Sequence, residues 1–113
     1  MATWEDVRTL ALELPEAEES TSYRKLAFKV RGKAFAWESP HEHGALVVRV
    51  DPGERPFLLG ANAAAYFVTP HYEAHPMLLV HLEPIDSNEL GERIEDSWLL
   101  SAPPKLAATL GPD

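Results

Sequence analysis

The sequence predicts a domain of mixed helices and strands, in the order helix, three strands, helix, two strands, helix. Apolar residues recur at helical spacing near both ends of the chain, and they alternate with a period of two in the runs between. Proline, glycine and aspartate mark the boundaries of these runs. Because 113 residues are the length of one domain, we expect a single domain over residues 1–113.

The first helix is expected to start at Thr3. Asp6 follows three residues later, as in a capping box with Asp in place of Glu or Gln. Pro15 ends this helix, and we expect the acidic residues 16–20 to form a solvent-exposed connection. The residues that give the helix one apolar face are Val7, Leu10, Ala11 and Leu14.

A period of two begins at Tyr23 and predicts a strand. Gly32-Lys33 fits a two-residue turn that needs a positive φ at the glycine, so the next strand should return beside the first. The turn predicts two cross-strand pairs on the buried face, which are Val30 with Phe35 and Phe28 with Trp37. After a turn at residues 41–44, a third strand should bury Leu46, Val48 and Val50 and leave Val47 and Arg49 outside.

The second half of the chain continues the alternation of helices and strands. Asp51-Pro52 predicts a helix start, and Pro56 predicts that this helix is short or begins late. Strands are expected at residues 66–68 and 77–82. Asp86 should cap a third helix with Leu90, Ile94 and Trp98 on its apolar face, and a last helical turn should follow within residues 105–110.

Composition narrows the classes of protein that the chain can represent. It has no cysteine, which excludes disulfides and cysteine zinc sites. The acidic start of the chain is unlike a secretory signal, and no apolar run is long enough to span a bilayer. We therefore expect a cytoplasmic protein without a membrane partner. Its net charge is −8, yet six of its ten lysines and arginines fall within residues 21–50.

Several strings occur in an order found in one family of proteins. They are Trp4-Glu5-Asp6-Val7-Arg8, Arg31-Gly32-Lys33-Ala34-Phe35-Ala36, Leu46-Val47-Val48-Arg49-Val50-Asp51-Pro52, Phe67-Val68-Thr69-Pro70-His71-Tyr72, the strand entry from Pro76 to Val80, and Trp98. In these strings the chain resembles the MmcQ/YjbR family of small bacterial proteins. The resemblance implies a compact α+β fold like that of frataxin-type domains, with an antiparallel sheet of about five strands and helices packed on one face. It also implies DNA binding, because the family is commonly labelled so on the basis of a double-wing arrangement.

A basic stripe on the outer face of the predicted sheet is the candidate surface for DNA. Its residues would contact phosphates, and nothing marks a helix that reads bases. The competing interpretation is that strand lysines protect exposed sheet positions from pairing with other chains. The acidic balance of the whole chain also opposes general nucleic-acid binding. The candidate residues are Lys25, Lys29, Arg31 and Arg49, with Lys33 at the hairpin tip.

The loop that contains His71 and Tyr72 is the candidate site for a small molecule or a protein partner. In this hypothesis the loop borders a cleft beside the sheet, with Arg49 and Trp98 as wall residues. His71 and Tyr72 would otherwise satisfy backbone groups at the end of a strand. His71 or Tyr72 could also stack on bases if nucleic acid is the partner.

Metal binding and catalysis receive little support from the sequence. His41-x-His43 and His71-x₃-His75 could each supply two metal ligands, but prolines flank the second pair and no cysteine completes a set. No nucleophile elbow, glycine-rich phosphate loop or paired carboxylates occur. We therefore expect a non-enzymatic binding protein without a cofactor. Trp37, Tyr66 and Phe67 are expected in the core.

Overall fold

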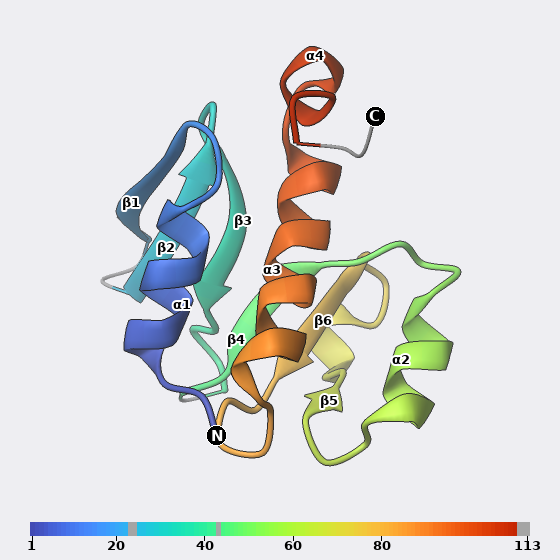
Figure 1. Ribbon diagram of the computed structural model, residues 1–113. Helices are drawn as coiled ribbons and strands as arrows, with labels where there is room; N and C mark the ends of the chain where they lie inside the picture. The colour runs from blue at the N-terminus through green and yellow to red at the C-terminus, as the bar shows by residue number, and fades with distance from the viewer. Residues whose placement is uncertain (23–24, 43, 111–113) are drawn as a thin grey trace.

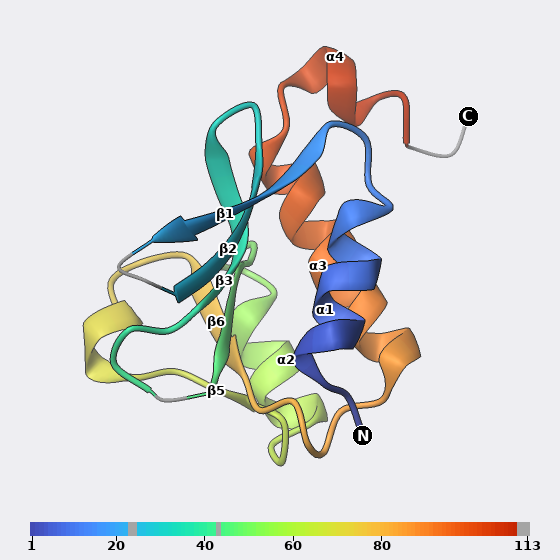
Figure 2. The same cartoon turned by 90° about the vertical axis from the view of Figure 1, so that its left-hand side faces the viewer.

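An antiparallel sheet forms one layer of the molecule, and helices α1 and α3 cover one of its faces (Figure 1, Figure 2). This computed structural model describes residues 1–22, 25–42 and 44–110. In those residues the sheet has six strands in the order β1-β2-β3-β4-β6-β5. The elements are α1 (Trp4–Leu12), β1 (Ala17–Ser22), β2 (Lys25–Val30), β3 (Lys33–Glu38), β4 (Leu46–Arg49), α2 (Arg55–Ala61), β5 (Tyr66–Phe67), η1 (Pro70–Tyr72), β6 (Met77–Val80), α3 (Ser87–Ser101) and α4 (Pro104–Ala107).

The α+β class and the antiparallel sheet with helices on one face are confirmed, but the sheet has one strand more than predicted. The acidic segment that we expected as a connection is strand β1, which pairs with β2 along its whole length. Strand β1 lies at the edge of the sheet, where it pairs with a neighbouring strand on one side only. Its sequence, Ala-Glu-Glu-Ser-Thr-Ser, has no alternation of apolar and polar residues that would have predicted a strand. Its Glu19 forms an ion pair with Arg8 of α1, at 2.9 Å, so a carboxylate takes the place of an apolar contact.

The β2–β3 hairpin differs from the predicted register because its turn lies one residue earlier. Arg31 and Gly32 both have positive φ, 52° and 82°, as in a type I′ turn. The pairing then passes from Lys29–Ala34 to Phe28–Ala36, so Phe35 is an extra residue in β3. Such a bulge reverses the alternation of the residues that follow it.

This bulge corrects the prediction that Trp37 lies in the core beneath the helices. Phe35 and Ala36 both belong to the helix-side core, and Trp37 packs with a smaller cluster on the opposite face. Phe67, also predicted in the core, lies beside that second cluster, whereas Tyr66 is buried on the helix side as expected.

The helix-side core follows the predicted patterns. Thr3 and Asp6 form the capping box of α1, and Asp86 caps α3. Helix α2 begins only at Arg55, as Pro56 suggested. The predicted faces of the strand and the helix meet in one buried cluster, which includes Leu46, Val48, Val50, Leu90, Ile94 and Trp98.

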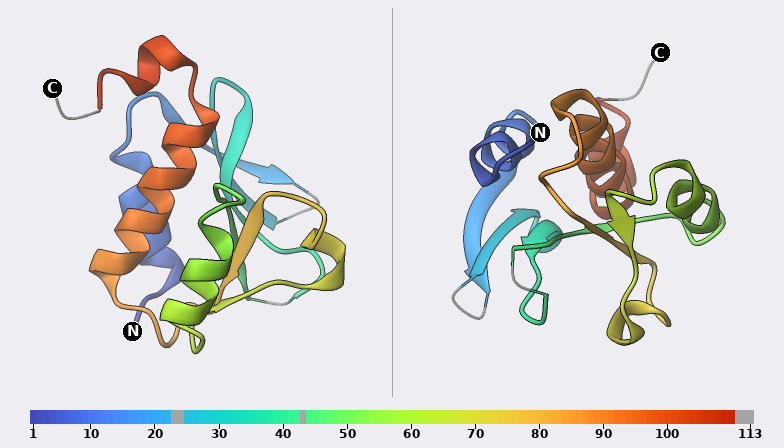
Figure 3. Two further views of the ribbon diagram at one scale, coloured as in Figure 1. Left: turned by 90° about the vertical axis from the view of Figure 1, so that its right-hand side faces the viewer. Right: turned by 90° about the horizontal axis from the view of Figure 1, so that it is seen from below.

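The far face of the sheet carries two projecting segments instead of helices. The loop between β3 and β4 and the segment around η1 both extend away from α1 and α3 (Figure 3). Tyr72 of η1 is buried there with Val47 and Leu79. We call this side of the sheet the outer face. None of the described helices is long and apolar enough to cross a membrane.

Candidate functional site

A groove on the outer face lies between the β3–β4 loop and η1. Its volume is about 610 Å³, within the range of ~300–1,000 Å³ typical of small-molecule sites. We call it the outer groove. Side chains from β2, β3, the β3–β4 loop and η1 line it, namely Lys25, Trp37, Glu38, Pro40, His41, His71 and Tyr72. The predicted His71-Tyr72 loop therefore does border a cleft, together with an aromatic side chain that the bulge turns outward.

Aromatic rings join the two sides of this groove. The ring centroids of His41 and His71 are 4.7 Å apart, although the two residues come from different loops. His71 also contacts Tyr72 edge to face at 4.7 Å. On the adjoining strand, the guanidinium of Arg49 lies over the Trp37 ring, 5.6 Å from its centroid.

Arg55 of α2 holds the loop that carries His71 and Tyr72. Its guanidinium donates hydrogen bonds to four backbone carbonyls, those of Tyr72 at 3.3 Å, Glu73 at 2.9 Å, His75 at 2.6 Å and Met77 at 3.1 Å. An arginine bonded to four carbonyls fixes the path of an irregular segment that lacks a ladder of its own. No local pattern in the sequence indicates this role, because Arg55 is simply the first residue of a short helix.

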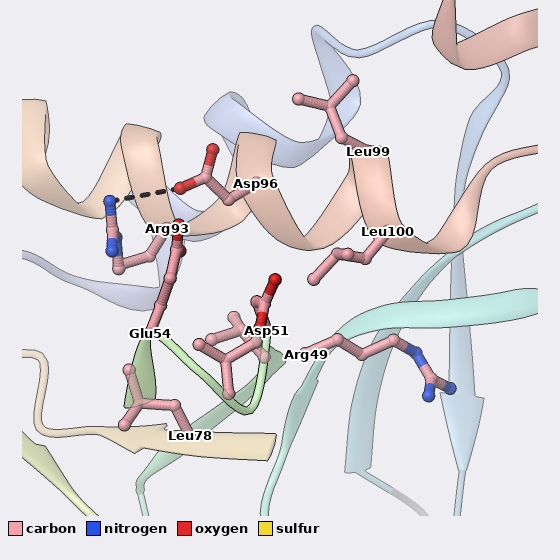
Figure 4. A pocket seen from close by; sticks show the side chains of 10 residues that line it. Arg49, Asp51, Glu54, Leu78, Arg93, Asp96, Leu99 and Leu100 are labelled. Carbon is pink, nitrogen blue, oxygen red and sulfur yellow. Dashed lines mark ion pairs between the residues drawn. The ribbon is translucent and has the colours of Figure 1, made fainter. Parts of the chain in front are cut away.

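A second cavity lies on the helix side, between α3 and the ends of β4 and β6 (Figure 4). Its volume is about 250 Å³, below the usual range for ligand sites. Arg93 forms an ion pair with Asp96 at 3.2 Å, and Asp51 and Glu54 line the same space. Arg49 lines this cavity too, but its guanidinium points away from the other charged groups (Figure 4).

Comparisons with known proteins place the chain among its relatives. A family model described as YjbR matches residues 12–100. The chain belongs to the YjbR family. The resemblance predicted from the sequence is thereby confirmed.

Two mycobacterial proteins and one solved structure are similar to this YjbR domain. The uncharacterised proteins Rv2570 of Mycobacterium tuberculosis and Mb2600 of Mycobacterium bovis are each 33% identical to it, over 94% of this chain and 93% of theirs. The crystal structure of Deinococcus radiodurans protein DR2400, which has a DUF419 domain, is similar with a TM-score of 0.74 and 26% identity. That similarity covers 88% of this chain and 78% of the other.

Several of the basic side chains predicted to contact DNA lie close to carboxylates of this YjbR domain. Arg31 is bonded to Glu16 at 2.5 and 3.0 Å, and this hydrogen-bonded pair lowers the pKa of the Glu16 carboxyl. Lys25 lies 3.8 Å from Glu38. Lys29 is directly opposite Glu18 in the neighbouring strand. Lys33 is exposed and forms no ion pair within the described residues.

Arg49 and Trp98, the predicted wall residues, lie apart. Arg49 is half-buried, which lowers its pKa, and its Nε donates to the carbonyl of Ala34 at 2.8 Å. Trp98 is completely buried in the helix-side core, where its Nε1 donates to the carbonyl of Pro15 at 3.1 Å. Trp98 therefore lines neither the outer groove nor the outer face, because helical spacing turns it toward the sheet.

Two further groups on the helix side are structural. The hydroxyl of Tyr66 donates to the Glu89 carboxylate at 2.5 Å, and burial together with this bond raises the pKa of Tyr66. The contact joins β5 to the first turn of α3. Among the described residues, no three histidine or acidic side chains are placed to hold a metal ion. His43, which belongs to the His41-x-His43 pair considered for metal binding, lies outside the described residues.

Proposed function

We propose that this protein is a non-enzymatic, cytoplasmic binding domain that takes a small molecule in the outer groove. One observation carries the proposal: three separate segments bring aromatic side chains together around a space of ligand size. Small-molecule sites are typically concave, with apolar or aromatic walls and a few polar groups. Trp37, Pro40 and Tyr72 supply the walls, and Lys25, Glu38 and the two histidines supply the polar groups.

The test is a fragment screen read out by protein NMR. We expect ring-containing fragments to shift backbone signals of residues 37–42 and 70–73, and to leave residues around the helix-side cavity unchanged. Fragments that shift signals of Asp51, Glu54 and Asp96 instead would move the site to that cavity. A screen in which no fragment perturbs the groove would refute the proposal.

DNA binding through the outer face is the second candidate function. Lys33 favours it, because this exposed side chain forms no ion pair in the described part of the chain. The Glu16–Arg31 and Lys25–Glu38 pairs oppose it, because phosphate contacts would have to displace these carboxylates.

Fluorescence anisotropy with a labelled duplex distinguishes the two functions. DNA binding predicts affinity at about 50 mM salt that falls steeply by about 200 mM, and that is lost in the Lys29→Ala/Lys33→Ala variant. The small-molecule function predicts no binding to the duplex at either salt concentration.

A further inference from the structure

We infer that the ligand of the outer groove is a planar aromatic anion, an inference that rests on the proposed small-molecule function. The ring of the ligand would lie against Trp37, and its acidic group would accept hydrogen bonds from Lys25 and the histidines. Three observations lead to this ligand class: the planar side chains of the groove walls, the donors that line the groove, and the loose contact of Lys25.

The walls favour a flat ring. Trp37, Tyr72 and His71 are planar side chains, and Pro40 adds a rigid apolar surface. Aromatic rings gain about 0.5–1.5 kcal/mol from stacked or edge-to-face contacts beyond the burial of their area. Trp37 is held in place by the Arg49 guanidinium over its ring, so the groove does not have to reorganise this side chain.

Several hydrogen-bond donors line the groove. The ammonium of Lys25 has three donors, and the rings of His41 and His71 each present at least one N–H in any tautomer. Among the residues that the structure describes, Glu38 is the one carboxylate that lines the groove. A ligand rich in acceptors, such as a carboxylate or a phosphate ester, satisfies these donors better than a neutral or cationic one.

Lys25 can serve a second acceptor. Its Nζ lies 3.8 Å from Glu38, longer than a charge-assisted hydrogen bond of about 2.7–2.9 Å, and no other ion pair of Lys25 occurs among the described residues. The ammonium is thus near the groove without being saturated by the protein. Lys29, on the same face of β2, lies opposite Glu18 and does not line the groove, which makes it a matched control.

The experiment is an NMR titration with three probes of similar size: 2-naphthoate, the neutral 2-naphthamide and the non-aromatic cyclohexanecarboxylate. We expect 2-naphthoate to bind with a Kd on the order of 0.1–1 mM and to shift the indole N–H signal of Trp37. The other two probes should bind at least about fivefold more weakly, because each lacks either the charge or the ring.

Variants test separately whether the ligand is recognised by its charge and whether it is recognised by its ring. Lys25→Met should weaken 2-naphthoate about fivefold, to the level of 2-naphthamide, and leave 2-naphthamide unchanged. Trp37→Leu should weaken the binding of both naphthalene probes about tenfold. Lys29→Met and Phe67→Leu alter the outer face beyond the groove. They should change the affinity for neither 2-naphthoate nor 2-naphthamide. If Trp37→Leu does not fold, the Lys25 variant and the three probes still decide the outcome.

Two results would overturn the inference. Equal affinity for 2-naphthamide and 2-naphthoate, or an equal loss in Lys25→Met and Lys29→Met, would reject an anionic ligand while the groove itself stands. If none of the three probes and no fragment of the screen perturbs the groove, the proposed function fails as well.

Discussion

The two faces of the sheet are built by different forces. On the helix side, Trp98, Ile94 and Leu90 of α3 pack on apolar strand residues and exclude solvent completely. On the outer face, a small cluster around Val47, Leu79 and Tyr72 is covered by one irregular segment, which polar contacts from Arg55 hold in place. Burial of apolar side chains therefore holds the helix side together, whereas a few hydrogen bonds shape the surface of the outer face.

The largest expected loss of stability comes from removing a buried side chain on the helix side of the sheet. Trp98→Ala removes the largest fully buried side chain and should lower the free energy of unfolding by about 3–5 kcal/mol. Trp37→Ala, on the outer face, should cost less than half as much because Trp37 is only partly buried. Urea unfolding of the two variants makes the comparison, and equal losses would contradict it.

The next largest effect concerns the hydrogen bonds by which α3 joins two strands of the sheet. The Ser97 hydroxyl accepts a hydrogen bond from the Arg49 amide at 2.8 Å and donates one to the carbonyl of Phe35 at 2.5 Å. It therefore bridges β3 and β4 where their own pairing ends. Ser97→Ala leaves buried backbone groups without a partner and should cost about 1–3 kcal/mol by urea unfolding.

Ser101 provides the control for this prediction. Its hydroxyl is also buried, but it donates to the Ser97 carbonyl within the same helix, at 2.8 Å. Ser101→Ala should therefore cost less than Ser97→Ala, since it separates no strands. Equal costs would show that the bridge between β3 and β4 contributes nothing beyond an ordinary buried hydroxyl.

On the outer face, the hydrogen bonds of Arg55 should control local order more than global stability. Arg55→Met removes the hydrogen bonds to the loop after η1 and should cost about 1–2 kcal/mol in global stability. Its main result should be faster hydrogen exchange at residues 72–77 and weaker fragment binding, with exchange in α3 nearly unchanged. Arg8→Met, which breaks ion pairs on the helix side, should leave exchange at residues 72–77 unaltered.

The smallest effect concerns pH. Hydrogen bonds from Arg31 and Arg8 lower the pKa of Glu16 and Glu19, respectively, below the ordinary value of 4.5. Stability from both pairs is therefore present above about pH 4.5 and is lost as the pH falls through the lowered pKa values. Calorimetry from pH 7 to 3 should show a smaller fall in Tm for Glu16→Gln than for the unmodified protein, and an identical fall would contradict the role of the pair.

The elements predicted correctly from the sequence share a local cause. The capping residues Thr3 and Asp86 bond within their own first turns, and the apolar spacing of Leu90, Ile94 and Trp98 follows from the helical repeat alone. Such signals depend on neighbours three or four residues away, so a sequence contains them in full.

The features that the sequence did not reveal depend on distant partners. Strand β1 is stabilised by pairing with β2, and its acidic residues show no period. The outer groove requires a turn shifted by one residue, a bulge and the contacts of Arg55, none of which leaves a pattern in the local sequence. The unusual residue types around His71 and Tyr72 make this loop a candidate site in the sequence alone, whereas Trp37 lies on the face opposite to the predicted one.

The extra residue in β3 makes the outer groove sensitive to the number of residues and not only to their chemistry. If all residues of the hairpin were kept but the bulge were lost, Trp37 would pair with Leu26 in place of Ala27, and its side chain would turn toward the helices. Deleting Phe35 would instead give a regular hairpin in which Trp37 still lies opposite Ala27, so the groove would keep its indole while the helix-side core would lose a fully buried ring. The position of the indole is therefore set by the number of residues between the turn and Trp37 as well as by the residue types that line the groove.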